Sequence, residues 1–117
     1  KPLPTLLHFK LIEKITDPDI IYLLAEKSGI EKLFTPGNHF EITEDENHIL
    51  LFIYASGIPE LFIAKNALIS PKILQQLILE IQNNETIIQE DFSSGIITAL
   101  ENYLHKSSPS GWLFDAQ

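Results

Sequence analysis

The sequence contains no cysteine, and its longest run of apolar residues, Ile49 to Ala55, is short. Without cysteine the chain has no disulfide bond, no Cys-ligated zinc, no iron–sulfur cluster and no thiol nucleophile. A helix that spans a bilayer needs roughly 20 predominantly apolar residues, so we expect no membrane insertion. Cysteine-free proteins occur in every compartment, and we slightly favour the cytoplasm.

Arginine is also absent, so lysine supplies all 8 positive charges against 16 from Asp and Glu, and the net charge is −8. Lysine cannot make the bidentate contacts by which arginine recognises guanine and phosphate. A net negative charge also repels the phosphate backbone that supplies most nucleic-acid affinity. We therefore expect no nucleic-acid partner. A basic protein would be attracted, although the charge could equally serve only to keep the domain in solution.

At 117 residues the chain is long enough to bury a core within one domain and too short for two. Ser107 to Gly111 is rich in serine, proline and glycine, which is typical of a linker. We therefore expect a single α+β domain over residues 1–106, followed by a linker and an apolar tail over 107–117. Trp112 and Phe114 in the tail would anchor it on the domain itself or on another molecule.

Apolar residues at helical spacing predict two N-terminal helices, at about 3–15 and 18–28, and two C-terminal helices, at about 71–82 and 94–105. Asp17-Pro18 and Ser70-Pro71 each place a capping residue before a proline at the first helical position, where a missing N–H costs nothing. Gly29 suits the end of the second helix, and Ser93 or Ser94 suits the start of the last. The stretch 85–90 is compatible with either a strand or coil.

The middle third is rich in β-branched and aromatic residues and predicts strands at about 39–43, 48–55 and 59–65. The acidic stretch 44–47 is expected to form the first hairpin loop, and Ser56-Gly57 the second turn. Three consecutive strands then form an antiparallel meander, which packs against the four helices in an α+β fold.

Alternation along these strands separates the side chains into two faces. A loop at 44–47 places Thr43 opposite His48, and a turn at Ser56-Gly57 places Phe52 opposite Leu61. The first face would be a core face that helix 71–82 covers; it contains Phe40, Ile42, Ile49, Leu51, Ile53, Phe62 and Ala64. The second face contains Leu50, Phe52, Tyr54, Leu61 and Ile63.

The second face is too apolar to face water, because burying each large side chain contributes about 1.5–3 kcal/mol. It is polar only toward the first hairpin. Three covers are possible: the chain's own helices, a second copy or partner protein, and a small molecule.

No catalytic or metal-binding motif is apparent, so we expect no cofactor and no metal. The four histidines lack metal-ligand spacing, and the scattered glycines form no phosphate-binding loop. Acidic residues concentrate around the first hairpin, at Glu41, Glu44, Asp45 and Glu46. This cluster is either a solvated turn or a contact surface for lysines and arginines of a partner.

The leading hypothesis is a non-catalytic protein-interaction domain of the adaptor, chaperone-like or immunity-protein type, binding a protein partner or a second copy of itself. Its candidate interaction residues are Leu50, Phe52, Tyr54, Leu61, Ile63, Glu41, Glu44, Asp45, Glu46, Trp112 and Phe114. A rival hypothesis is a small-ligand-binding domain, or an enzyme without cysteine chemistry, with a pocket beside the second face lined by Tyr54, His39, His48 and Glu41. A third is a regulatory module excised from a larger protein.

Overall fold

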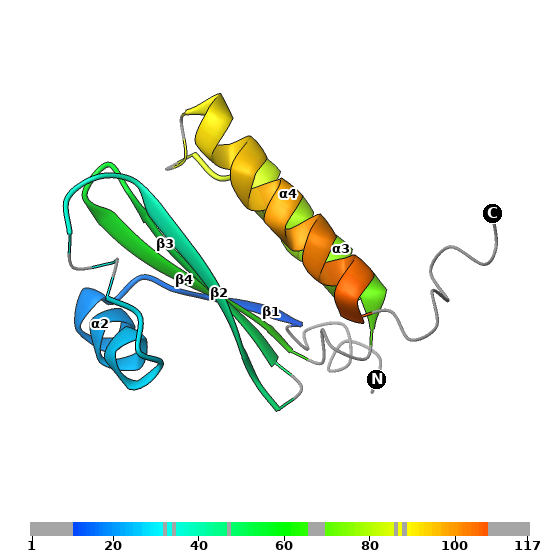
Figure 1. Ribbon diagram of the computed structural model, residues 1–117, viewed down its shortest axis with the longest axis horizontal. Helices are drawn as coiled ribbons and strands as arrows, with labels where there is room; N and C mark the ends of the chain where they lie inside the picture. The colour runs from blue at the N-terminus through cyan, green and yellow to red at the C-terminus, as the bar shows by residue number, and fades with distance from the viewer. Residues whose placement is uncertain are drawn as a thin grey trace, which may run out of the picture.

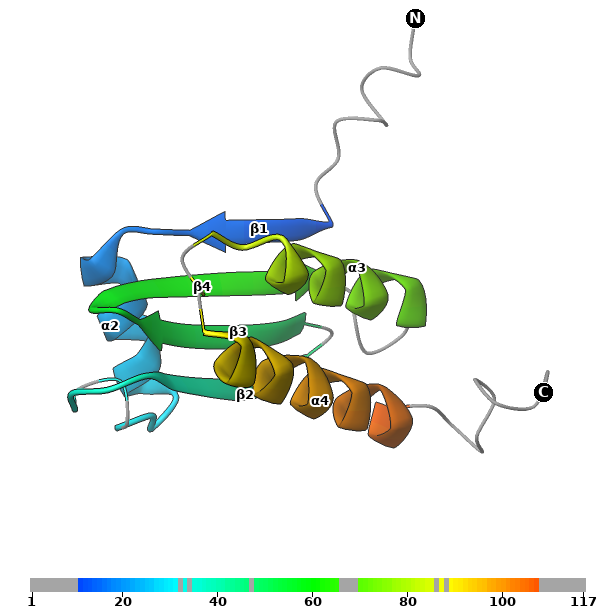
Figure 2. The same ribbon diagram turned by 90° about the horizontal axis from the view of Figure 1, so that it is seen from above.

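The computed structural model describes residues 11–31, 33, 35–46, 48–65, 70–85, 87 and 89–107. Along the chain these form β1 (Ile12–Ile15), α2 (Pro18–Lys27), β2 (His39–Asp45), β3 (His48–Ala55), β4 (Ile58–Lys65), α3 (Pro71–Gln82) and α4 (Glu90–Ser107). The four strands form one antiparallel sheet in the order β1-β4-β3-β2. Helices α3 and α4 lie side by side over one face, and α2 lies against the opposite face (Figures 1 and 2).

The structure confirms the α+β class but corrects the three-stranded meander to a four-stranded sheet. Residues 12–15, which we expected at the end of a helix, form β1 and pair with β4, with Ile12 opposite Ala64 and Ile15 opposite Leu61. The Lys65 N–H extends this pairing by donating to the Leu11 carbonyl at 2.8 Å. The open edge of β4 offers hydrogen-bond partners to residues 12–15. The free energy gained by this pairing outweighs the weak helical preference of these residues. Residues 3–10 of the predicted helix lie outside the described residues.

Helix α2 has the two ends that its sequence predicts. Asp17 caps the start, because its Oδ1 accepts a hydrogen bond from the Asp19 N–H at 3.0 Å. At the other end Gly29 adopts a φ of 72° and donates its N–H to the Glu26 carbonyl at 3.1 Å. Ile30 then donates to the Ala25 carbonyl at 2.9 Å, which completes a Schellman motif and turns the chain back toward the sheet.

Two glycines should respond to alanine in opposite directions. Gly29→Ala should lower the free energy of unfolding by about 1 kcal/mol, because the left-handed φ disfavours a Cβ. Gly95 lies within α4 and an added Cβ there meets nothing within 4 Å, so Gly95→Ala should raise stability by about 0.5–1 kcal/mol. Urea unfolding followed by circular dichroism measures both. If both substitutions changed the free energy of unfolding equally, the assigned end of α2 at Gly29 would be contradicted.

The first hairpin is tighter than expected. Strand β2 continues to Asp45, which lies opposite His48, so only residues 46 and 47 connect the strands. Thr43 therefore lies opposite Leu50 rather than His48. The error is two residues, and because side chains alternate with a period of two, the predicted faces survive it. Glu46 adopts a φ of 54°, as a two-residue hairpin turn requires.

The second hairpin agrees with its prediction. Ser56 and Gly57 have φ values of 56° and 80°, the pattern of a type I′ turn, and Phe52 lies opposite Leu61. The side chain of Asn38 supports this turn, since its Oδ1 accepts a hydrogen bond from the Ser56 N–H at 3.1 Å.

The helices over the first face differ in how well they were predicted. Helix α3 has its predicted bounds, whereas α4 begins at Glu90, four residues before the expected start. The Ser93 N–H is used inside the helix, donating to the Gln89 carbonyl at 3.0 Å. Glu90 and Asp91 place negative charge in the first turn, where the helix dipole favours it. The Asn38 side chain donates to Gln89 Oε1 at 2.9 Å and so ties this start to β2.

The sheet separates two apolar cores, as the strand patterns predict. The core between the sheet and α3 and α4 contains Ile49, Leu51, Ile53, Ala55, Phe62, Ala64, Ile73, Leu74, Leu77, Ile81, Ile87, Ile96 and Leu100, with Phe40 and Ile42 packed against it. The smaller core beneath α2 contains Ile21, Ala25, Ile30, Leu33, Phe52 and Leu61.

Candidate functional site

The chain's own helix covers half of the second face. Phe52 and Leu61 are completely buried and pack with Ile21 and Ala25 of α2. Because these two candidate interaction residues lie inside a core, they offer no surface to a partner in this structure. Tyr54, at the margin of the same core, is half-buried.

No described helix or strand lies over the other half of this face, toward the first hairpin (Figure 1). One row of side chains crosses the four strands there through Thr43, Leu50, Ile63 and Glu13, and a second row contains Asp45, His48 and Lys65. We call these seven residues the open end of the second face. Leu50 and Ile63 form its apolar centre and are only half-buried. Glu13 and Lys65 form an ion pair at 3.7 Å along one side.

The predicted acidic cluster is divided among different surfaces. Glu41 and Asp45 point to the second face, whereas Glu44 points to the helix-covered face. Glu44, Asp45 and Glu46 are exposed, and Glu41 is half-buried. All four lie on or beside β2, so this strand carries negative charge on both faces. Trp112 and Phe114, the remaining candidates, lie outside the described residues.

Glu44 has a partner on α4. Burial, and then the neighbouring Glu44 carboxylate, raise the pKa of Tyr103 above its usual value near 10.0. The folded protein thus keeps this proton where the unfolded chain loses it, so the free energy of unfolding should fall as the pH rises above about 10. Between about pH 8 and pH 11, urea unfolding should show a smaller decrease in the free energy of unfolding for Tyr103→Phe than for the wild type. Equal slopes would contradict the assigned interaction.

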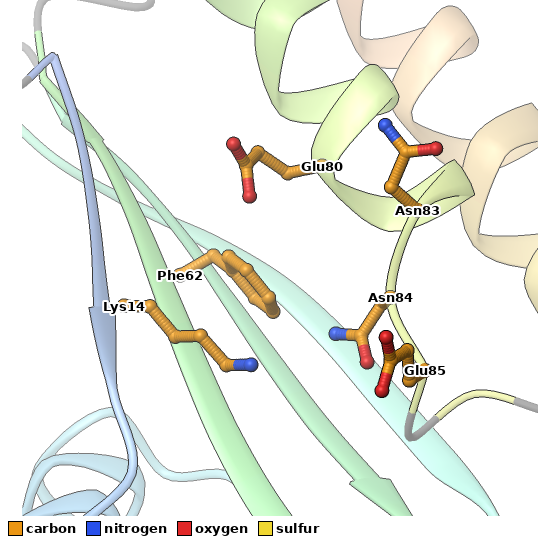
Figure 3. A pocket seen from close by; sticks show the side chains of 6 residues that line it. All are labelled: Lys14, Phe62, Glu80, Asn83, Asn84 and Glu85. Carbon is orange, nitrogen blue, oxygen red and sulfur yellow. The ribbon is translucent and has the colours of Figure 1, made fainter.

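A polar hollow lies on the helix-covered side, near β1 (Figure 3). It has a volume of about 290 Å³ and is lined by Lys14, Phe62, Glu80, Asn83, Asn84 and Glu85. Beside it lies Glu60, which is 3% exposed. Glu60 Oε2 lies 3.1 Å from Lys14 Nζ, and Oε1 accepts a hydrogen bond from Asn84 Nδ2 at 3.0 Å. The Lys14 ammonium also lies 5.6 Å from the centre of the Phe62 ring.

This arrangement joins β1, β4 and the segment after α3 through one carboxylate. Both oxygens of Glu60 have partners within the chain, as the burial of a charged group demands. We did not identify Glu60 from the sequence, although alternation along β4 places it on the core face with Phe62. A charged residue at a core position was the available signal, but its partner Lys14 was assigned to a helix.

A second hollow, of about 350 Å³, lies beside α2 and is lined by Tyr22, Leu33, Thr35, Pro36 and Tyr54. Burial, followed by a hydrogen bond and charge interaction with Tyr54, raises the pKa of Tyr22. His39 Nε2 lies 3.0 Å from the Pro36 carbonyl, which can only accept, so this nitrogen carries a proton.

The residues of the rival ligand-pocket hypothesis are only partly brought together. His39 lies opposite Tyr54, whereas His48 lies at the far end of β3 with its Nδ1 3.1 Å from the Asp45 carbonyl. Of these four residues only Tyr54 lines the hollow; His39, His48 and Glu41 do not. The two histidines therefore cannot act on one small ligand there.

Within the described ranges, no group of three or more His, Asp or Glu residues converges as a set of metal ligands. Nor does any helix in that part of the chain combine the length and apolar character needed to cross a membrane. Comparison with protein-family models, with curated proteins and with solved structures gives no match. The function must therefore be argued from the surfaces described above.

Proposed function

We propose that the protein is a non-catalytic interaction domain that binds another protein through the open end of the second face and the acidic residues beside it. The observation that carries this proposal is the unequal cover of a sheet that is apolar on both faces. Helix α2 buries Phe52 and Leu61, while Leu50 and Ile63 continue the same apolar surface with no described element over them. Full burial of such side chains contributes about 1.5–3 kcal/mol each, and because Leu50 and Ile63 are only partly buried, some of that gain is left for a partner.

The surroundings of this apolar centre favour a basic partner. Asp45 and Glu13 lie at the two sides of the open end, and Glu41 and Glu46 lie close by on β2 and its turn. Lys65 is the one cation of the open end, and it is paired with Glu13. A charged rim around an apolar centre is the usual arrangement of a protein interface and steers partners of opposite charge.

Selection of displayed peptides tests this proposal. A random library selected on the wild-type chain should yield binders that lose at least tenfold affinity for the variant Leu50→Gln/Ile63→Gln. The matched control is Leu79→Gln, which removes an apolar side chain that is 56% exposed on α3. Binders should tolerate the control. Thermal unfolding would establish that all variants are folded, and binders insensitive to Leu50 and Ile63 would contradict the proposal.

The hollow between Tyr22 and Tyr54 supports a second candidate function, the binding of a small molecule. Its lining combines two tyrosines with Leu33, Thr35 and Pro36, and its volume of about 350 Å³ lies at the lower end of the range of small-molecule pockets. A fragment screen by amide NMR would favour this function if chemical shifts change around Tyr22 and Tyr54. Fragments that shift only the open end of the second face would favour protein binding instead.

A further inference from the structure

Strand β2 forms one outer edge of the sheet, and no described strand pairs with its outer side. It is seven residues long and pairs continuously with β3. Proteins usually protect such an edge with proline, lysine, a bulge or a very short strand. Strand β2 has no proline or lysine and no interruption in its register. By contrast, β1 at the other edge has four residues and contains Lys14.

Acidic side chains are the one protective feature of β2. Glu41, Glu44 and Asp45 lie on the strand itself, and Glu46 follows in the turn. If β2 paired with β2 of a second copy, the same carboxylates would be brought together from both chains. Like charges on adjacent strands are destabilising, so this edge disfavours its own copy. The same charges favour an extended segment that is basic.

We propose that β2 binds a basic, extended segment of a partner protein as a fifth strand of the sheet. This inference rests on the proposed function and adds the chemistry and conformation of the partner. The outward N–H and C=O groups of β2 would pair with the backbone of the segment, as in other cases of strand addition. The acidic side chains would select its charge.

The two faces of β2 also define the pattern of the segment. An added strand places its side chains alternately beside those of the two faces of β2. On the second face its neighbours are His39, Glu41, Thr43 and Asp45, of which the two carboxylates favour lysine or arginine. On the helix-covered face its neighbours include Phe40 and Ile42, which are half-buried. Phe92 of α4 packs edge-on against Phe40, with ring centroids 6.0 Å apart, and extends this apolar surface.

Alternating basic and apolar residues are therefore the expected pattern. The probe is a fluorescent eight-residue peptide that alternates valine and lysine. Three comparison peptides each remove one feature: alternating valine and glutamate reverses the charge, four valines followed by four lysines removes the alternation, and N-methylation of every second residue removes backbone donors. Fluorescence anisotropy should show at least tenfold weaker binding for all three. Amide hydrogen exchange of β2 should slow when the alternating valine–lysine peptide binds.

A pair of variants tests the location. Glu41→Lys/Asp45→Lys should weaken binding of the valine–lysine peptide at least tenfold. The control Glu26→Lys/Glu101→Lys makes the same change in net charge at exposed positions of α2 and α4, and it should weaken binding less than threefold. At physiological salt distant charges are screened within about 8 Å, so the two pairs are distinguishable. The peptide comparisons use the wild-type chain and remain decisive if a variant unfolds.

Two results would overturn strand addition. Equal binding of the N-methylated peptide would show that the backbone of the segment is not used. An equal loss for the two variant pairs would show that only net charge matters. Either result leaves the proposed function intact if displayed binders still depend on Leu50 and Ile63. If they do not depend on these residues, it is the proposed function that fails.

Discussion

Replacing Phe52 with alanine should lower the free energy of unfolding by about 3–5 kcal/mol, the largest effect that we expect from one substitution. Phe52 is completely buried at the centre of β3, opposite Leu61 and beneath Ile21 and Ala25 of α2. The substitution leaves a cavity between two elements that are each held by their neighbours, so collapse cannot fill it. Urea unfolding followed by circular dichroism measures the loss.

Leu79→Ala is the matched control for this experiment. Leu79 is 56% exposed on α3, and its truncation should change stability by no more than about 0.5 kcal/mol. If Phe52→Ala lowered the free energy of unfolding by less than the control does, α2 would not pack on the second face as described. Phe52 would then return to the set of residues available to a partner.

The second large effect is expected at the ion pair between Lys14 and the buried Glu60. Lys14→Met keeps the apolar stem of the side chain and removes the ammonium 3.1 Å from Glu60. Removing one partner of a buried pair typically costs about 3–5 kcal/mol, because the other charge is left uncompensated. Since the Lys14 side chain is 43% exposed, water softens this penalty, and we expect a loss of about 1–3 kcal/mol in urea unfolding at neutral pH.

Two further variants separate this effect from a general loss of charge. Lys65→Met breaks the more exposed pair with Glu13, whose charged atoms lie 3.7 Å apart, and should cost less than about 1 kcal/mol. Adding Glu60→Gln to Lys14→Met should recover most of the loss, because glutamine is neutral and its amide oxygen can still accept from Asn84. No recovery would mean that Lys14 acts by packing on Phe62 rather than by compensating Glu60.

The elements that the sequence predicted well are those whose signals are local. Helix α3 begins where Ser70 precedes Pro71, and α2 ends where Gly29 provides a left-handed φ. The second hairpin follows from Ser56-Gly57, and its register places Phe52 opposite Leu61 as alternation requires. The two-faced apolar pattern of the central strands also led correctly to the need for a cover. The local sequence pattern could not predict how much of the second face helix α2 covers.

The features that were missed depend on partners distant in the chain. Residues 12–15 are too few to distinguish a helix end from a strand, and their pairing with β4 decides the matter. Glu60 could not be recognised as half of an ion pair while Lys14 was assigned to a helix. The start of α4 at Glu90 depends on tertiary contacts such as the one between Asn38 and Gln89. For the site, the acids around the first hairpin were identified, but Glu44 and Asp45 were assigned to the loop, whereas they lie on strand β2.

The pairing of β1 with β4 has a consequence for how the chain folds during its synthesis. Strands β2, β3 and β4 follow one another through tight turns, so their hairpins can close within microseconds of leaving the ribosome. Strand β1 is made first, yet its only partner strand in the described sheet emerges about fifty residues later. At the usual 5–20 residues per second, β1 must wait about 3–10 s for that partner. Its two central residues, Glu13 and Lys14, are charged and keep this waiting segment in solution until the sheet can receive it.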